Sequence, residues 1–349
     1  MKRSKKFSKK RKFSTQKQIS LPEDLFSIIN AFEPNPSIKR LSRSISNKLL
    51  PIQKIKEFYE TSLNIRARSN TELANEVAKY PNLKELYCYE SLITELPLNL
   101  NKLQILDCSH THITELPQNL NNLQHLDCYW TDITELPPNL NKLQILNCFG
   151  TQITELPQNL NNLQQLDCSH THITELPLNL NKLQILNCFQ TQITELPLKN
   201  LNNLQHLDCS HTHITELPQN LNNLQILNCS STPITKLPPN LNNLQQLGCS
   251  STPITKLPPN LNNLQKLYCS QTEITELPQN LNNLQILNCS STPITKLPPN
   301  LNNLQILYCS ETHITELPPD LNNLQLVCSS SSTLKIPKSI IRNIIYLII

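Results

Sequence analysis

Glycine, aromatic residues and long apolar runs are scarce in this chain of 349 residues. It contains two glycines, Gly150 and Gly248, one Trp and one Met, and aromatic residues make up 5% of the total. A globular domain of this length normally uses far more Gly in its turns. The scarcity predicts a fold that makes the same turn many times with other residues, here Asn and Pro.

Segments typical of export or of membrane insertion are also missing. Met1 leads directly into Lys2, Arg3, Lys5 and Lys6, without the apolar stretch of a signal peptide. No run reaches the roughly 20 apolar residues of a membrane span. We therefore expect a reducing compartment, the cytoplasm or the nucleus.

Cysteine, by contrast, is abundant, and its spacing is regular. One Cys falls in each stretch of about 20 residues, at positions 88, 108, 128, 148, 168, 188, 209, 229, 249, 269, 289, 309 and 328. Such a period marks a sequence repeat rather than a disulfide framework. We expect these side chains to be reduced thiols in a repeated core.

The repeat unit is represented by residues 103–122, LQILDCSHTHITELPQNLNN, in which Leu103 is position 1 and Asn122 is position 20. Apolar residues occupy positions 1, 4, 6, 11, 14 and 18. Positions 4 and 6 alternate with 3, 5 and 7, as a short strand requires. Stacked in parallel, thirteen such strands predict a sheet roughly 60 Å long, in which each unit buries its apolar residues against its neighbours.

This unit resembles the leucine-rich repeat, LxxLxLxxNxL followed by a variable half. The resemblance implies an α/β solenoid, a horseshoe with a parallel sheet on its concave face and a small N-terminal helical segment. It also implies twelve repeats over residues 81–323 and a degenerate last repeat with a C-terminal cap over residues 324–349. Similar ITELP-type units occur in proteins of giant viruses and protists and in bacterial effectors, so a viral chain would act inside a host cell.

Two positions depart from the family pattern, and one insertion breaks the period. Cys replaces Leu at position 6, and Thr replaces Asn at position 9, where its hydroxyl is predicted to bond the backbone of the neighbouring turn. The extra residue within residues 197–200 is expected to bulge on the convex side. The apolar tail, residues 340–349, predicts a cap over the open sheet end, with a membrane anchor as the alternative.

The first 80 residues lack the repeat. Residues 1–17 carry nine Lys or Arg and no acid, and residues 1–19 are predicted to be a disordered basic arm. The arm is either a solvated tail or a nuclear-localisation or nucleic-acid patch. Residues 20–80 have helical periodicity, and a last helix capped by Asn70 or Thr71 is expected to turn Leu73, Ala74 and Val77 toward the first strand.

Within this region, Leu21-Pro22-Glu23-Asp24-Leu25 and the Ile-rich stretch after it resemble an F-box, although the closing Trp of that family is missing. The resemblance implies that residues 20–50 bind the adaptor subunit of a cullin-type ubiquitin ligase. A plain helical cap over the first repeat is the alternative. The adaptor-binding residues would be Leu21, Pro22, Leu25, Ile28, Ile29, Ile38, Leu41 and Ile45.

Signals for chemistry are weak. Cys-x-His-x-His occurs three times, beginning at Cys108, Cys168 and Cys209, and Cys and His are zinc ligands. However, position 6 faces the core and position 8 leaves the strand toward solvent, so duplicated surface His is the preferred interpretation. No Gly-rich phosphate loop occurs, and little chain follows Pro337. We expect no enzymatic activity, no cofactor and no metal.

The repeats differ from one another mainly at positions 3, 5, 7, 8 and 10, which line the concave face and its rim. In the first half these positions are aromatic among polar groups, as is typical of protein interfaces. Covering of strand edges is the alternative role. The predicted partner-binding residues are Tyr87, Tyr89, Ile105, Asp107, His125, Asp127, Tyr129, Trp130, Ile145, Phe149, Ile185 and Phe189.

These observations predict a protein-interaction scaffold with a protein target on its concave face. Its sharper form is a substrate receptor of a cullin-type ubiquitin ligase, in which the F-box-like segment holds the adaptor. A plain binding module without any link to ubiquitination is the alternative. We expect no membrane partner, and nucleic acid only at the basic arm.

Overall fold

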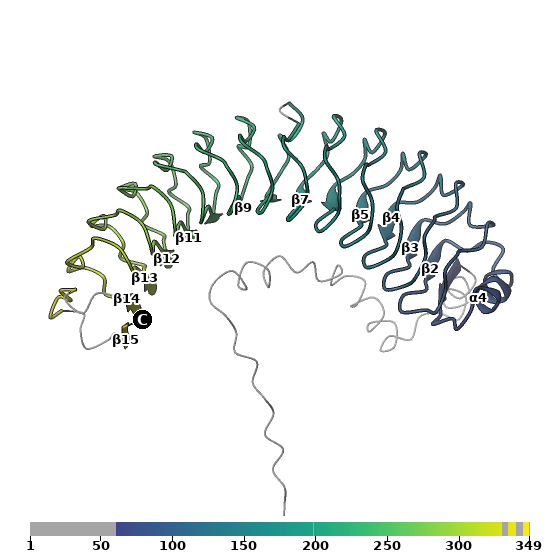
Figure 1. The fold of residues 1–349 in the computed structure, drawn as a ribbon, viewed down its shortest axis with the longest axis horizontal. Coiled ribbons are helices and arrows are strands. Elements are labelled where there is room, and N and C mark those ends of the chain that lie inside the picture. The colour runs from purple at the N-terminus through teal and green to yellow at the C-terminus, as the bar shows by residue number, and fades with distance from the viewer. Residues whose placement is uncertain (1–60, 198, 330–333, 340–344, 349) are drawn as a thin grey trace, which may run out of the picture. The chain divides into compact units, whose positions relative to one another are not determined.

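The computed structural model describes residues 61–197, 199–329, 334–339 and 345–348 (Figure 1). The chain divides into two units, residues 1–57 and 58–349, and every described residue belongs to the second. The basic arm predicted for residues 1–19 and the F-box-like residues 20–50 therefore lie outside the described residues.

The second unit is a solenoid built on one sheet of 15 parallel strands, which pair in the order of the sequence. Strands of successive repeats pair in register, one unit apart, for example Leu106 with Leu126. The array bends into an arc with the strands on its inner side (Figure 1). This confirms the predicted leucine-rich-repeat horseshoe with a parallel sheet on the concave face. The strands are β1 (Ser62–Asn64), β2 (Glu85–Tyr87), β3 (Ile105–Asp107), β4 (His125–Asp127), β5 (Ile145–Asn147), β6 (Gln165–Asp167), β7 (Ile185–Asn187), β8 (His206–Asp208), β9 (Ile226–Asn228), β10 (Gln246–Gly248), β11 (Lys266–Tyr268), β12 (Ile286–Asn288), β13 (Ile306–Tyr308), β14 (Leu326–Ser329) and β15 (Ile345–Ile348).

Two of these strands were not expected. β1 lies in the segment predicted to be helical, where it pairs Leu63 with Leu86 of β2. β15 lies in the apolar tail and pairs with β14, Val327 opposite Tyr346. The sheet thus continues beyond the repeats at both ends, because an added strand satisfies the hydrogen-bonding groups that the first and last repeat would otherwise expose.

The described helix, α4 (Asn70–Val77), covers the start of the array. Its N-cap is Ser69, whose hydroxyl accepts a hydrogen bond from the amide of Glu72, rather than the predicted Asn70 or Thr71. Leu73 and Val77 are buried as predicted, but Ala74 is exposed. None of the helices described here is long and apolar enough to cross a bilayer.

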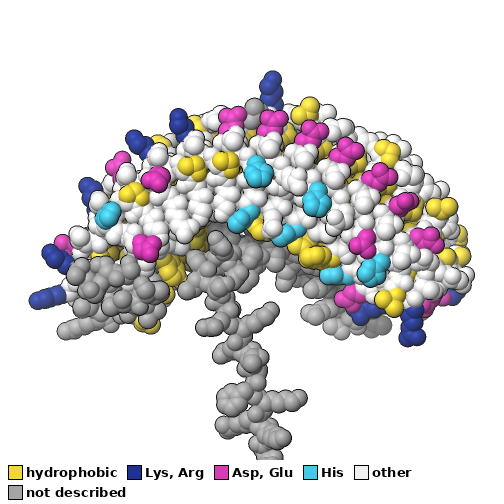
Figure 2. All heavy atoms as spheres, viewed as in Figure 1, with side chains coloured by type: hydrophobic (Ala, Val, Ile, Leu, Met, Phe, Trp, Pro, Cys, Tyr) yellow, Lys and Arg dark blue, Asp and Glu magenta, His cyan; other side chains and the backbone are white. Residues whose placement is uncertain are grey.

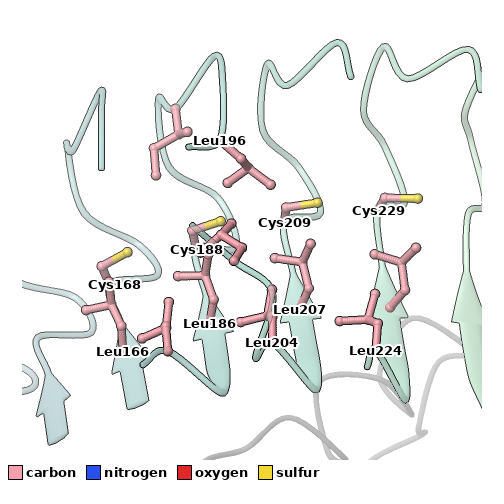
Figure 3. Close-up of a cluster of buried hydrophobic side chains, with 14 of the residues drawn as sticks. Leu166, Cys168, Leu186, Cys188, Leu196, Leu204, Leu207, Cys209, Leu224 and Cys229 are labelled. Carbon is pink, nitrogen blue, oxygen red and sulfur yellow. The ribbon is translucent and has the colours of Figure 1, made fainter. Parts of the chain in front are cut away.

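The core consists of the repeated apolar positions. Leu103, Leu106, Cys108 and Ile113 have no exposed surface, and the same positions are buried in the other repeats. Each buried Leu or Ile contributes about 1.5–3 kcal/mol. The Cys side chains of successive repeats point the same way along the array (Figure 3). Parallel side chains do not meet as a disulfide requires, and the twelve cysteines from Cys88 to Cys309 are free thiols.

Repeated hydrogen bonds of polar side chains stabilise the turns, although not at the position that the family pattern predicts. The hydroxyl of Thr111 donates to the carbonyl of Cys108 in its own unit at 2.6 Å, so the predicted bond to the neighbouring turn is wrong. The link between units is made at position 20 instead. There the amide of Asn122 donates to the carbonyl of Asn101 in the preceding unit at 2.9 Å. Asn162, Asn203, Asn223, Asn243, Asn263, Asn283, Asn303 and Asn323 repeat this contact.

The insertion within residues 197–200 leaves the sheet undisturbed. β7 and β8 pair Ile185 with His206, a spacing of 21 residues, in the same register as their neighbours. The extra residue is therefore accommodated away from the strands.

Candidate protein-binding surface

The turn after each strand has an unusual backbone. Position 8 has a positive φ, between 52° and 56°, in eleven repeats that carry no Gly there, Trp130 and His170 among them. This left-handed conformation costs an ordinary residue about 1–2 kcal/mol. The amide of Trp130 donates to the carbonyl of Phe149 in the next unit at 2.9 Å, and other repeats do the same. Backbone pairing between units therefore maintains the turn.

The side chain at position 5 supports the same turn. The carboxylate of Asp107 accepts from the amide and hydroxyl of Ser109, at 3.1 and 2.6 Å. The amide of Phe149 likewise donates to the side chain of Asn147 at 3.2 Å. Asp and Asn at position 5 thus both supply an oxygen that caps this turn, whereas the repeat of Gly248 forms the same turn, with Ser251 at a φ of 56°, without one. Asp107, which the sequence predicts to contact a partner, thus also stabilises its own turn.

These turns bring the rings of positions 7 and 8 together along the edge of the sheet. We call the row of Trp130, Phe149, His170, Phe189 and His211 the ring ladder. Its successive ring centroids are 5.3, 5.0, 4.9 and 5.3 Å apart, in edge-to-face arrangements. His110 and Tyr129 form a further pair at 4.7 Å. Each ring is thus held by rings of the neighbouring units rather than by its own unit.

Trp130 has the most exposed of the three apolar rings in the ladder. Its side chain is 54% exposed, whereas Phe149 and Phe189 are half-buried. It lies over Gly150, where an added Cβ would come within 3.2 Å of Trp130 Cε3. Gly150 therefore provides the space in which the Trp130 ring packs.

The repeat positions around the ladder carry carboxylates but neither Lys nor Arg. We call positions 3, 5, 7, 8 and 10 of the seven repeats from β2 to β8 the ladder face. These positions contain seven carboxylates and no Lys or Arg. Burial raises the pKa of Asp127 to about 8, with repulsion from Asp107 as the second cause. Burial also raises the pKa of Asp167 to about 6. The carboxylates are Glu85, Glu90, Asp107, Asp127, Asp132, Asp167 and Asp208.

Histidine is concentrated on the same face. Eight of the nine His residues occupy these positions, and His side chains gather over the N-terminal half of the flank seen in Figure 2. Burial lowers the pKa of His125 and of His206, and burial followed by repulsion from His211 lowers that of His170.

Along the outer edge, acidic side chains follow β2 to β8, and Lys side chains appear farther along (Figure 2).

The twelve predicted partner-binding residues lie on β2 to β5 and β7 or in the turns directly after these strands. Tyr87, Ile105, His125, Ile145 and Ile185 are half-buried on the strands, and Asp127 is buried. The sequence interpretation missed His110, His170 and His211, which it treated as surface duplicates. Their common place at position 8, next to aromatic position 7 of the next unit, was the available signal.

Other sequence signals lead to different surroundings. In Cys-x-His-x-His, Cys108 is buried while His110 and His112 are exposed. Within the described ranges, no group of three or more His, Cys, Asp or Glu side chains is placed to hold a metal ion. The adaptor-binding residues predicted between Leu21 and Ile45 lie outside the described residues.

The second half of the array carries a different surface. A trough of about 630 Å³ is lined only by amide side chains of positions 2 and 20, among them Gln225, Asn243 and Gln245. It offers hydrogen bonds but neither charge nor an aromatic ring. The ring ladder and its carboxylates therefore form the more distinctive surface.

Comparisons with known proteins agree with this architecture. The Leucine Rich Repeat family model matches residues 102–123, 203–224, 223–244 and 283–304. A search of the curated proteins found no match. A leucine-rich-repeat protein of Leptospira interrogans is 25% identical, covers 81% of this chain and 80% of its own, and has a TM-score of 0.70.

Two further solved structures share the fold. The functional domain of InlJ from Listeria monocytogenes, which includes a cysteine ladder, is 27% identical, with 77% of this chain and 67% of that chain covered and a TM-score of 0.66. The plant peptide hormone receptor RGFR1, in complex with RGF2, is 22% identical, with 82% and 54% covered and a TM-score of 0.67. The chain contains leucine-rich repeats and folds as they do.

Proposed function

We propose that this leucine-rich-repeat solenoid is a non-catalytic scaffold that binds a protein target on its ladder face. The observation that carries the proposal is the ring ladder itself, in which the single Trp of the chain is 54% exposed next to the half-buried ring of Phe149. Partly exposed aromatic side chains surrounded by polar groups are the usual anchors of protein interfaces.

The rigidity of the ladder favours binding. Each ring contacts a ring of a neighbouring unit, and its backbone is hydrogen-bonded to a neighbouring unit. Side chains that are already ordered lose little conformational entropy when a partner docks. The fold adds support, because leucine-rich-repeat arrays are protein-interaction modules, and the plant receptor above is described in complex with its peptide hormone.

Alanine substitution of Tyr129, Trp130 and Phe149 together tests this proposal. A target is first identified by affinity capture with the full chain, purified, and titrated against each variant by calorimetry. We expect the triple variant to lose at least about 100-fold in affinity, because it removes three neighbouring anchors. The matched control replaces Leu98 and Leu178, which are 80% and 68% exposed and lie outside the ladder face, by Ala.

The control should bind like the unsubstituted chain. Undiminished binding by the triple variant, with its thermal unfolding unchanged, would overturn the proposal. A triple variant that unfolds early is replaced by Trp130→Ala alone, because the side chain of Trp130 is more than half exposed and its removal opens no core cavity.

We propose in addition that residues 20–50 bind a cullin-ligase adaptor, which would make the target of the repeats a substrate for ubiquitination in the cytoplasm or nucleus. The support is the LPEDL motif at residues 21–25 and the Ile-rich stretch after it. Co-purification of the full chain with the adaptor tests it, with Leu21→Ala/Leu25→Ala as the disrupting variant and Lys5→Ala/Lys6→Ala as the control. Without a complex, the plain binding scaffold remains.

A further inference from the structure

The ladder face is rich in carboxylates. Two of them already lie beside a basic side chain, Glu90 beside Arg66 at 2.8 Å and Asp132 beside His112 at 3.2 Å. The seven carboxylates of this face meet no Lys or Arg at the same positions, and over β9 to β13 these positions hold only two carboxylates and one Lys. Asp127 is 6% exposed, lies opposite Asp107 in the sheet register, and its Oδ1 accepts no hydrogen bond. Close carboxylates repel one another when both are ionised, so a cation bound beside them would favour their charged form.

Arg66 shows how a cation can fit against this face. The guanidinium carbon of Arg66 lies 5.3 Å from the ring centroid of Tyr89, and its Nη2 lies 2.8 Å from Oε2 of Glu90. Arg66 thus contacts a ring at position 7 and a carboxylate at position 8 together. Tyr129, Phe149 and Phe189 repeat the ring at position 7, and among the described residues no cation lies over them.

We propose that the ladder face recognises a basic, arginine-containing segment of its protein target. The proposal rests on the function proposed above and specifies the chemistry of the partner. A guanidinium stacks on aromatic rings and bonds carboxylates with two parallel donors, whereas a Lys ammonium does neither as well. From Trp130 to His211 the ladder runs about 20 Å, the length of about six extended residues.

The single Trp of the chain is a built-in reporter of occupancy. Trp130 fluorescence is followed while the full chain is titrated with a hexapeptide that alternates Arg and Ser. The two comparison peptides carry Lys or citrulline in place of Arg, and citrulline keeps the shape of Arg without its charge. We expect a saturable change with the Arg peptide, at least about fivefold weaker binding of the Lys peptide, and no saturation with the citrulline peptide.

A charge variant tests the role of the carboxylates. In Asp107→Asn/Asp127→Asn/Asp167→Asn/Asp208→Asn, each substitution introduces the residue that other repeats, such as those of Asn147 and Asn187, already carry at position 5. We expect it to bind the Arg peptide at least about tenfold more weakly. The matched control, Glu115→Gln/Glu135→Gln/Glu155→Gln/Glu175→Gln, removes the same charge from exposed position 13 and should bind nearly unchanged, because solvent screens distant charges.

Equal binding of the Arg and citrulline peptides, or equal losses in the two charge variants, would overturn the inference. Its failure is separate from that of the proposed function. If the captured target still requires Tyr129, Trp130 and Phe149 while no basic peptide binds, the protein-binding site stands and the basic partner does not. If the triple variant keeps its target, the binding site itself is wrong.

Discussion

The ring of Trp130 lies against the backbone of Gly150, so close that a single added carbon on Gly150 would stand 3.2 Å from Trp130 Cε3. Gly150 has a φ of +66°, in the turn where the other described repeats carry His, Gln, Ser, Glu or Trp. One of the two glycines of the chain is therefore located where the exposed Trp needs room.

Replacing Gly150 by Ala should displace Trp130 and weaken the fold. The methyl group enters the space of the ring, and Ala at a positive φ adds strain of about 1–2 kcal/mol. We expect a lower Tm and a shifted Trp emission maximum. Gly248→Asn is the control, since Asn is the residue of several repeats at that position 5. Unaltered Trp emission from Gly150→Ala would contradict the packing described for this pair.

The opposite change at another turn should stabilise the chain. Ser231 has a φ of 55°, and Gly adopts that conformation without the steric cost that Ser incurs. The greater freedom of Gly in the unfolded chain offsets part of the gain, so Ser231→Gly should stabilise by about 0.5–1 kcal/mol. Urea unfolding midpoints measure it. Ser230→Gly, one residue earlier and without a positive φ, should destabilise, and a gain there instead would refute the explanation.

The sequence predicts the buried residues of the repeats well. Leu106, Cys108 and Ile113 recur at fixed positions, and a parallel stack of identical units leaves a single consistent way to bury them. The concave sheet and the free thiols follow from the same period. These features depend on what every unit shares.

What the sequence did not predict depends on contacts between units or on residues outside the period. The left-handed turn at position 8 has little local signal, because Trp130, Gln190 and Ser231 are not residues that favour a positive φ, although His is. The ring ladder joins position 8 of one unit to position 7 of the next, so no single unit reveals it. β1 was missed because residues 62–64 lack the repeat that marks the other strands.

The hydroxyl of position 9 should prove more important than its small size suggests. Thr252 is buried and donates to the carbonyl of Cys249 at 2.6 Å. Thr252→Val keeps the shape but leaves that carbonyl without this donor, which should cost about 1–3 kcal/mol. Thr255→Val, an exposed Thr of the same unit, should stay within about 0.5 kcal/mol. Equal unfolding midpoints for the two variants would show that the hydroxyl contributes nothing.

Asp127 should make the stability of the solenoid depend on pH. Burial raises its pKa to about 8 in the folded chain, whereas an unfolded Asp titrates near about 3.9. Between these values the folded state binds more protons than the unfolded state, so this group lowers the free energy of unfolding as pH rises from about 4 to 8. Above pH 8 its carboxylate is charged in both states, and the full cost of burying that charge remains.

Asp127→Asn removes this cost and should therefore stabilise the chain more at high pH than at low pH. The amide keeps the cap of the turn, as Asn147 does in the next unit, where it accepts from the amide of Phe149. We expect the difference in urea midpoint between Asp127→Asn and the unsubstituted chain to grow from pH 5 to pH 8.5 and to level off above that. Glu135→Gln, an exposed carboxylate of the same unit, should show no such growth. A difference for Asp127→Asn that is the same at both pH values would mean that the Asp127 carboxyl is not held protonated by the fold.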